Sequence, residues 1–309
     1  MKNISCNVCG SDHNKLLYKS KDRLHRTDET VFDVNQCLDC SLVFLNPQPT
    51  PEELEKFYPK AYGPYQNSNQ ILKYGLLSMT LKKFLIFFQS NTIPNHIRKK
   101  ENKPQETEVL NYLDFGCGGG AQLEDMRAQH PNWNFYGLDN NDFACEQARN
   151  KGFKIFCGDI LNMNLPENFF DVVNMSHIIE HVHDPKAVLK RIYATMKPDA
   201  KLIVSTPNFN SLAAKIFRSY WYALDTPRHL FLFSQKNLSQ LLHDCGFVIK
   251  KIEFDPGPKA ALRSFYYLLG RRDMSISPIV WRLFQPLSNA LSFFGQTSIM
   301  TVRAQKQLQ

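Results

Sequence analysis

A glycine-rich turn with an acidic residue just ahead of it is the feature that most constrains this chain. Residues 112–122 read Tyr-Leu-Asp-Phe-Gly-Cys-Gly-Gly-Gly-Ala-Gln, so that Asp114 comes two residues before Gly116 and four before Gly118. Glycine at such a point lets a strand turn sharply into a helix and lets a ligand approach the backbone closely, as in nucleotide-binding α/β folds. The stretch therefore predicts a strand, a ligand-binding turn and a helix.

The charge of Asp114 indicates which kind of ligand binds at this turn. A carboxylate beside a helix N-terminus would repel a pyrophosphate and attract a cationic amino-acid group. S-adenosylmethionine (SAM) carries an ammonium, a sulfonium and an adenosine, and it has no phosphate. We therefore expect SAM as the cofactor. An NAD-dependent oxidoreductase would fit the glycine spacing superficially, but Asp114 argues against it on charge.

From residue 108 onward the chain alternates strand-like and helix-like segments. This order predicts an α/β, Rossmann-like domain over residues 108–309, with a mostly parallel seven-stranded sheet and helices on both faces. The expected strands are 109–115, 134–138, 154–157, 170–175, 201–205, 247–254 and 298–304. The expected helices are 122–129, 143–150, 185–196 and 237–245, and an apolar insertion occupies about 255–297.

Two more acids follow strands of this predicted sheet, at the edge where ligands of such sheets bind. Asp139 follows the second strand, with Asn140 beside it, and is placed to accept hydrogen bonds from ribose hydroxyls. Asp159 follows the third strand, placed to accept from the adenine amine while Ile160 donates its backbone N–H. A single acid at a strand end is common in turns, but three in succession behind a glycine loop indicate an adenosine site.

Four cysteines near the amino terminus form two C-x-x-C knuckles, Cys6 with Cys9 and Cys37 with Cys40. Four thiolates are the ligand set of a closed structural zinc site. So small a segment would need metal binding to fold, so we expect Zn²⁺ and a zinc-ribbon-like module over residues 1–65, with 15–19 and 30–36 able to pair as a hairpin. The alternatives are four unrelated reduced cysteines or a redox pair.

Residues 66–107 are expected to form a helical linker or cap, with many large apolar side chains over 69–100. This segment would pack on the catalytic domain or on a partner subunit, or lie on a membrane surface. The net charge of +8 permits an anionic partner such as a nucleotide-linked sugar, a nucleic acid or an acidic membrane, although scattered surface lysines explain it equally well. No clear nucleic-acid motif accompanies the basic residues.

Neither a signal peptide nor a membrane-spanning segment is expected, because no apolar run follows Met1 and none reaches spanning length. We therefore expect a cytoplasmic protein, with peripheral contact at the inner membrane face as an option. In that reducing compartment the cysteines outside the knuckles should be small buried thiols. These are Cys117, Cys145, Cys157 and Cys245.

Residues 108–254 resemble the class I SAM-dependent methyltransferase family through the stretches 113–120, 136–139, 158–159 and 177–181. The resemblance implies that Asp114, Gly116 and Gly118 hold the methionine end of SAM, Asp139 the ribose and Asp159 the adenine. The two knuckles, with residues 46–49 and 221–230, resemble sugar C-methyltransferases of glycan and antibiotic-sugar pathways, which implies a sugar acceptor.

Candidate catalytic residues follow the fourth strand, where an acceptor would meet the methyl group. His177-Ile-Ile-Glu180-His181 would place both histidines on one face if it formed a helical turn. The resemblance points to Glu180 and His181 as the acid–base pair. The alternatives are a structural turn with the base elsewhere, or a metal site made by these three residues and His229.

The loop 221–230 could close over the acceptor, with His229 and Arg228 as its useful polar groups; Arg228 would suit a phosphate or carboxylate. The expected activity is SAM-dependent methyl transfer to a small molecule, a sugar or glycan precursor, at carbon or oxygen. One alternative is a membrane-surface quinone or lipid O-methyltransferase, which the apolar stretches 69–90 and 258–297 motivate. An alternative of another class is a SAM- or nucleic-acid-binding module without catalysis.

Overall fold

The computed structural model describes residues 1–58, 108–271 and 275–307. The helix expected over 69–100, the linker that contains it and the last residues of the expected zinc module lie outside the described residues.

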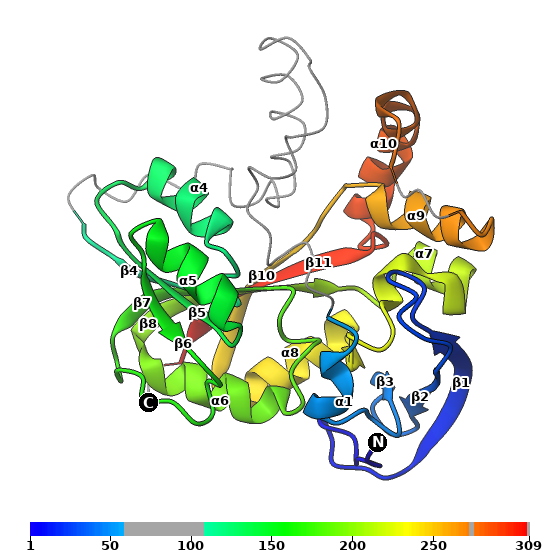
Figure 1. Cartoon of the computed structure of the whole chain (residues 1–309), viewed down its shortest axis with the longest axis horizontal. Coiled ribbons are helices and arrows are strands. Elements are labelled where there is room, and N and C mark those ends of the chain that lie inside the picture. Colours follow the sequence, from blue (N-terminus) through cyan, green and yellow to red (C-terminus); the bar gives the residue numbers. More distant parts are fainter. Residues whose placement is uncertain (59–107, 272–274, 308–309) are drawn as a thin grey trace.

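A seven-stranded sheet forms the centre of the molecule, in the order β10-β11-β8-β7-β4-β5-β6 (Figure 1). Only β11 runs antiparallel to its neighbours in this described sheet, so the predicted mostly parallel α/β fold is confirmed. The strands are β4 (Asn111–Phe115), β5 (Asn134–Asp139), β6 (Lys154–Cys157), β7 (Phe170–Ser176), β8 (Met196–Pro207), β10 (Phe247–Phe254) and β11 (Ile299–Lys306).

Helices cover both faces of this sheet because successive strand residues point to opposite sides. Tyr112 on β4 packs in one apolar cluster with Leu123 of α4, whereas its neighbour Leu113 packs in another with Leu189 of α6. Asp184 caps α6 by accepting from the backbone N–H of Ala187, as its place before a proline predicts. The helices are α4 (Ala121–Gln129), α5 (Asp142–Asn150), α6 (Pro185–Thr195) and α8 (Gln235–Asp244).

A second, four-stranded antiparallel sheet contains the amino-terminal segment. The expected hairpin forms from β1 (Asn14–Lys21) and β2 (Val31–Cys37), followed by β3 (Val43–Leu45). The fourth strand, β9 (Phe231–Leu232), comes from the far part of the chain and pairs with β3. This pairing joins the amino-terminal segment to the stretch that directly follows His229.

Short helices complete the described structure. α1 (Pro51–Glu55) follows β3 and begins at a capping box between Thr50 and Glu53. After β8 come α7 (Leu212–Phe217) and two single 3₁₀ turns, Arg218–Tyr220 and Tyr222–Leu224. The apolar stretch between β10 and β11 forms α9 (Lys259–Leu268) and α10 (Pro278–Phe293), which lie together at one end of the molecule in Figure 1.

One expectation about the cysteines is wrong. Cys117 and Cys245 are buried free thiols, but Cys145 on α5 and Cys157 at the end of β6 form a disulfide. The packing of α5 against β6 places their Cα atoms 6.0 Å apart, within the ordinary range for a bridge. Neither residue belongs to a paired motif, so their spacing in the sequence did not indicate the bond.

Candidate active site

The glycine loop follows β4 as a tight turn into α4. Gly116 has a φ of +79°, and a Cβ atom there would lie 1.9 Å from the Cδ1 atom of Ile178. A side chain would therefore both strain the backbone and collide with the segment after β7. The backbone N–H of Gly118 donates to Asp139 Oδ2 at 2.8 Å, which fixes the loop against the end of β5.

Asp114 is a buried carboxyl at the end of β4, 2% exposed. Its carboxylate accepts a hydrogen bond from Asn174 Nδ2 at 2.9 Å, and no cation pairs with it among residues 1–58, 108–271 and 275–307. Burial raises the pKa of Asp114 to about 7; the Asn174 hydrogen bond lowers it and the charge of Asp139 adds to the rise. The other amide atom of Asn174, Oδ1, is buried without a partner in the same described ranges. The Asp114 carboxyl and the Asn174 oxygen together suit a positively charged ligand group that donates hydrogen bonds, such as an ammonium.

The two other predicted cofactor acids differ in their surroundings. Asp139 is buried and accepts from the backbone N–H groups of Gly118 and Asn141, and burial raises its pKa. Asp159 is exposed, and its carboxylate accepts from the backbone N–H of Leu161 at 3.1 Å and from Asn162 Nδ2 at 2.7 Å. Asn140 is exposed and Ile160 is buried. Asp139 ends β5, Asn140 follows it, and Asp159 and Ile160 follow β6, at the edge that carries the glycine loop.

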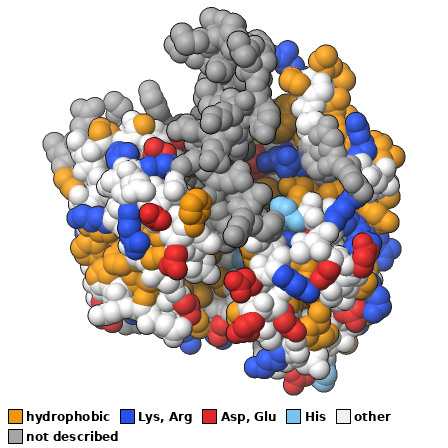
Figure 2. Space-filling model, in the orientation of Figure 1, with side chains coloured by type: hydrophobic (Ala, Val, Ile, Leu, Met, Phe, Trp, Pro, Cys, Tyr) orange, Lys and Arg blue, Asp and Glu red, His pale blue; other side chains and the backbone are white. Residues whose placement is uncertain are grey.

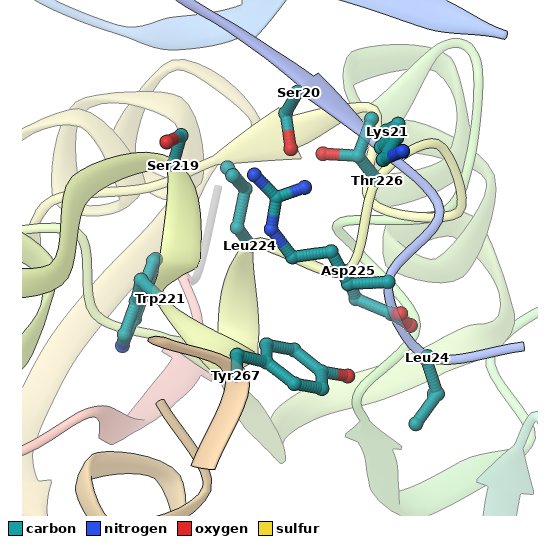
Figure 3. Close-up of a pocket in the computed structure, with 10 residues that line it drawn as sticks. Ser20, Lys21, Leu24, Ser219, Trp221, Leu224, Asp225, Thr226 and Tyr267 are labelled. Atoms are coloured by element: carbon teal, nitrogen blue, oxygen red, sulfur yellow. The ribbon is translucent and has the colours of Figure 1, made fainter. Parts of the chain in front are cut away.

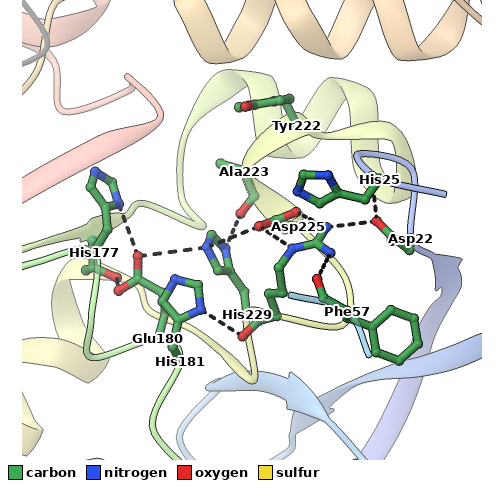
Figure 4. Close-up of polar contacts among 12 residues, drawn as sticks. Asp22, His25, Phe57, His177, Glu180, His181, Tyr222, Ala223, Asp225 and His229 are labelled. Atoms are coloured by element: carbon green, nitrogen blue, oxygen red, sulfur yellow. Dashed lines mark hydrogen bonds and ion pairs between the residues drawn. The ribbon is translucent and has the colours of Figure 1, made fainter. Parts of the chain in front are cut away.

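Glu180 is the centre of a cluster of polar side chains after β7 (Figure 4). Its side chain is fully buried; Oε1 lies 3.1 Å from His177 Nδ1, and Oε2 accepts a hydrogen bond from Thr206 Oγ1 at 2.9 Å. Burial opposes ionisation, but the hydrogen bond from His177 and the neighbouring histidine charges lower the pKa of Glu180 to about 2. Glu180 is therefore an anion at neutral pH.

The protonation of His181 follows from its contacts. Its Nδ1 lies 3.0 Å from the carbonyl oxygen of Arg228, which can only accept a hydrogen bond, and 3.1 Å from Tyr58 Oη. Nδ1 therefore carries the hydrogen, and Nε2 keeps a lone pair. Burial and the charge of His229 lower the pKa of His181 to about 4, against the effect of Glu180. The ring is thus neutral at physiological pH, as a proton acceptor must be.

His229 lies between two carboxylates. Its Nδ1 is 2.8 Å from the carbonyl oxygen of Ala223, and its Nε2 is 4.0 Å from Glu180 Oε1 and 3.9 Å from Asp225 Oδ2. Its ring centroid lies 4.6 Å from that of His181. The structure therefore brings together Glu180, His181 and His229, three of the four predicted catalytic residues, as a tight group.

His177 contacts the cluster, but it does not do so from a helical turn as expected. It has a φ of +57°, in the left-handed region, and its 43% exposed side chain contacts Glu180 alone of the three. The turn 177–181 is not helical, because His177 is held by a backbone bond to Ser205 at the end of β8. The ligand atoms of Glu180, His181 and His229 lie within 4.8 Å of one another, as a metal site would need, and His177 is not in that group.

Arg228 does not have the role expected for it. Its side chain is fully buried and donates to Asp225, to Asp22 of the amino-terminal sheet and to the carbonyl oxygen of Phe57. The guanidinium is thus used for internal contacts and not for a substrate phosphate or carboxylate. The surrounding stretch 221–230 is likewise packed inside the protein, with Trp221 1% exposed, and not a loop free to close.

A small cavity lies beside this cluster (Figure 3). It lies between the end of β1 and the stretch 219–226, with Tyr267 of α9 on another side. Asp225 lines it, but none of Glu180, His181 and His229 does, nor does the glycine loop. The cavity is therefore separate from the group that would perform the chemistry.

The four knuckle cysteines come together at the edge of the amino-terminal sheet. Their sulfur atoms lie within 4.8 Å of one another, with Cys6–Cys40 at 3.4 Å and Cys9–Cys37 at 3.5 Å. Thiolates around a tetrahedral zinc ion with bonds of about 2.3 Å would be about 3.8 Å apart, so this set fits the metal. Both knuckles end in the same turn, with positive φ at Gly10 and at Ser41.

Four residues of the site were not predicted. Tyr58 contacts His181, Asp225 lies between Arg228 and His229, Thr206 bonds Glu180, and Asn174 bonds Asp114. Asp225 stands within the stretch 221–230 that was singled out for other residues. Asn174 and Thr206 are ordinary strand residues that no local pattern distinguishes, whereas Tyr58 belongs to the tyrosine-rich run 57–65, a pattern typical of pocket linings as well as of packing between modules.

Comparison with known proteins adds a family match. The profile of a family described as "Methyltransferase domain" matches residues 83–252. The chain is 29% identical over 159 residues to a ubiquinone biosynthesis O-methyltransferase of Coxiella burnetii, covering 48% of this chain and 64% of that protein. It is 30% identical over 99 residues to a sterol 24-C-methyltransferase of Aspergillus fumigatus, covering 29% of this chain and 26% of that one.

A third relative is an uncharacterized 37.1 kDa protein in a transposon of Streptomyces fradiae, to which the chain is 28% identical over 44% of that protein's length. The chain thus spans less than two thirds of the length of each of these relatives. Among solved structures, the [4+2]-cyclase SpnF is similar with a TM-score of 0.51 and 16% identity, covering 85% of this chain and 98% of that one. That likeness concerns the fold. None of the helices in the described part of the chain has the length and apolar character needed to cross a membrane.

Proposed function

We propose that this chain, which belongs to the methyltransferase domain family, is a SAM-dependent enzyme that methylates a sugar or glycan precursor, with Glu180, His181 and His229 as its acid–base group. The observation that carries this assignment is the neutral, hydrogen-bonded imidazole of His181 next to a buried anion, Glu180. A base so placed can take a proton from an acceptor hydroxyl or acidic carbon.

The cofactor end of the site is proposed from Asp114 and the glycine loop. A buried carboxyl with no cationic partner among the described residues is costly to ionise, and a ligand ammonium would supply the missing charge. Gly116 and Gly118 would hold the methionine end, Asp139 and Asn140 the ribose, and Asp159 with Ile160 the adenine. When bound, SAM supplies a methyl group already activated on a sulfonium, so positioning accounts for much of the rate.

The protein's own part in the chemistry is to hold and move one proton. His181 Nδ1–H donates to the Arg228 carbonyl, which leaves Nε2 as the proton acceptor. The imidazolium formed would be stabilised by the Glu180 carboxylate, which Thr206 and His177 keep oriented. His229 is oriented by the Ala223 carbonyl and lies close to the same Glu180 carboxylate, where it would relay or hold a second proton.

Two classes of acceptor are considered for this site. The knuckles with the stretches 46–49 and 221–230 resemble sugar C-methyltransferases, which favours a sugar, including a nucleotide-linked or lipid-linked one. The relatives named above act, by their names, in ubiquinone biosynthesis and on a sterol carbon, so a quinone or lipid acceptor is the second candidate. An exposed apolar surface on α9 and α10 favours that second candidate.

A transfer assay with methyl-labelled SAM tests the proposal. The enzyme is offered nucleotide-linked sugars in one arm and water-soluble quinols in the other, and His181→Ala is compared with wild type. We expect label in a sugar fraction, lost in His181→Ala although that variant still binds SAM. Label in quinols alone would replace the sugar acceptor, and full activity in His181→Ala would remove His181 as the base.

A further inference from the structure

Helix α10 has its polar and apolar sides reversed with respect to an ordinary surface helix. Gln285 Nε2 donates to the carbonyl oxygen of Pro256 at 2.8 Å, Ser288 is buried, and Ser292 Oγ donates to the carbonyl oxygen of Phe254 at 2.5 Å. The spacing of three and four residues puts these polar groups on one face, and that face is turned toward the protein. In water, the face turned inward is normally the apolar one.

Large apolar side chains occupy the outer side of α10. Ile279 is 70% exposed, Leu283 72%, Leu287 56% and Phe293 84%. Scattered exposed leucines are normal, but a whole helical side of them marks an interaction surface. The reversal predicts that this side of the helix faces an apolar medium in the working protein.

Helix α9 continues this surface. Leu268 and Leu269 at its end are 55% and 58% exposed, and Figure 2 shows hydrophobic side chains gathered over α9 and α10, with Lys and Arg among them. We call the exposed apolar side chains of α9 and α10 the apolar face, namely Leu268, Leu269, Ile279, Leu283, Leu287 and Phe293.

The charge around the apolar face is strongly basic. Residues 255–297 contain five basic residues and two acids, and in the part of this stretch that the structure describes the basic residues are Lys259, Arg263, Arg271 and Arg282 and the acid is Asp255. Basic residues close to an anionic membrane surface are attracted to it, and salt weakens that attraction. Two copies of such a face would repel each other, so the charge argues against self-association and for an anionic surface.

The apolar face is one helix away from the proposed active site. On α9, Ser264 Oγ accepts from the backbone N–H of Tyr222, and Arg263 Nη1 donates to Tyr222 Oη at 2.7 Å. Tyr222 begins the short turn that leads to Asp225 and His229. A surface that touches a bilayer through α9 and α10 would therefore hold the site close to the lipid–water boundary.

We propose that the apolar face docks on an anionic lipid bilayer, with α10 lying in the plane of the interface and its apolar side among the acyl chains. Amphipathic helices with basic flanks bind membranes in this way, without spanning them. Docking does not depend on whether the acceptor is a sugar or a quinone, and its test needs no methyl transfer.

Flotation with vesicles tests the docking. The full chain is mixed with vesicles of phosphatidylcholine and phosphatidylglycerol, or of phosphatidylcholine alone, at low and high salt. We expect flotation with the anionic vesicles, weakened by salt and reduced at least about tenfold in the double variant Leu283→Glu/Leu287→Glu. The matched control is Leu16→Glu/Val31→Glu, which replaces two exposed apolar side chains on the amino-terminal sheet. This control variant should float as wild type does.

Two further measurements keep the proposal falsifiable. Brominated lipids should quench the fluorescence of a tryptophan placed on the apolar face in Leu283→Trp more strongly than that of the unmodified protein, because Trp281 lies four positions before Gln285, on the side of α10 turned toward the protein. Thermal unfolding checks that both double variants fold. Equal flotation of the two double variants, or no quenching, would overturn the docking, as would a dimer in light scattering that only Leu283→Glu/Leu287→Glu abolishes.

Discussion

The guanidinium of Arg228 donates a 2.8 Å hydrogen bond to the carboxylate of Asp22, a residue 206 positions earlier in the chain, and both side chains are fully buried. Arg228 also pairs with Asp225, which lies 3.9 Å from His229. The backbone carbonyl of Arg228 in turn orients His181. One buried residue thus ties the amino-terminal sheet to both histidines of the proposed catalytic group.

Replacing Arg228 should destabilise the whole protein. Arg228→Met would leave the Asp22 and Asp225 carboxylates buried without their cation, a change that costs about 3–5 kcal/mol in comparable buried pairs. Urea unfolding followed by circular dichroism measures the loss. The control is Lys19→Met, which breaks a surface pair with Asp33 and should cost less than about 1 kcal/mol. Equal effects would show that burial of the Arg228 network is energetically unimportant.

The same network predicts a dependence of stability on acid. Burial would raise the pKa of Asp22, but its bonds to Arg228 and Thr27 lower it to about 2. A carboxyl whose pKa is lowered by folding stabilises the protein above its unfolded value of about 3.9, and that contribution is lost as the pH falls toward 2. Unfolding measured from pH 5 downward should show this loss in wild type and less of it in Asp22→Asn. Parallel curves for the two proteins would contradict it.

Binding of SAM should depend on pH through Asp114. Burial raises its pKa to about 7, so below that pH a proton must leave Asp114 before it can pair with the ammonium of the cofactor. Affinity should therefore rise as the pH increases through about 7, with proton release in calorimetry at the acid end. Asp114→Asn should weaken binding by at least about 30-fold, from roughly 2 kcal/mol for one partner of a buried charge pair, and should abolish the pH dependence.

The exposed Asp125→Asn on α4 is the control for that experiment, with affinity expected to be unchanged. Wild-type affinity that stays constant between pH 5 and pH 9 would contradict the pairing of Asp114 with the ammonium.

His181 should govern turnover without governing cofactor binding. His181→Ala is expected to lower kcat by about 10²- to 10⁴-fold, the usual contribution of a general base, with an unchanged Kd for SAM. Because burial and His229 lower the pKa of His181 to about 4, the ring stays neutral down to weakly acid pH. At saturating SAM, the acid limb of kcat/KM for the acceptor in wild type should therefore fall near pH 4 and not near 6.5. His243→Ala, a largely exposed histidine on α8, should leave both parameters unchanged.

Removal of the metal should loosen the active site through the amino-terminal sheet. Elemental analysis should find one zinc ion per chain, lost in Cys9→Ser and retained in Cys245→Ser. The knuckle is tied to the catalytic part by Asn237 Nδ2, which donates to the Cys40 carbonyl, and by the pairing of β3 with β9. Cys9→Ser should therefore lower the Tm and the activity together. A metal-free protein of unchanged Tm would refute a structural role for the ion.

The sequence predicted best what is encoded locally. The central sheet was predicted in nearly correct bounds, from the glycine loop, the acids at strand ends and the alternation of apolar strands with capped helices. These signals can be read from the sequence because turns, caps and periodicity depend on neighbours in the chain. The roles of Asp114, Asp139 and Asp159 toward SAM stay predictions. So do those of Glu180, His181 and His229, although the structure places these three together.

What the sequence did not predict depends on contacts between distant segments. Arg228 was expected to meet a substrate because its partner Asp22, which directly follows β1, lies far away in the sequence, and no local pattern connects the two. His177 was expected in a helical turn, but a backbone bond to Ser205 holds it in a left-handed conformation. The bond between Cys145 and Cys157 likewise depends on how α5 packs against β6.

The pairing of β3 with β9 has a consequence for synthesis on the ribosome. Phe44 finds its partner only when Phe231 has emerged, so the edge of β3 stays open while most of the chain is still being made. Open strand edges are sites of wrong pairing between nascent chains. If the four cysteines bind zinc, the two knuckles could close early and hold β2 and β3 in place, and the supply of zinc during translation would then decide how many chains reach the native fold.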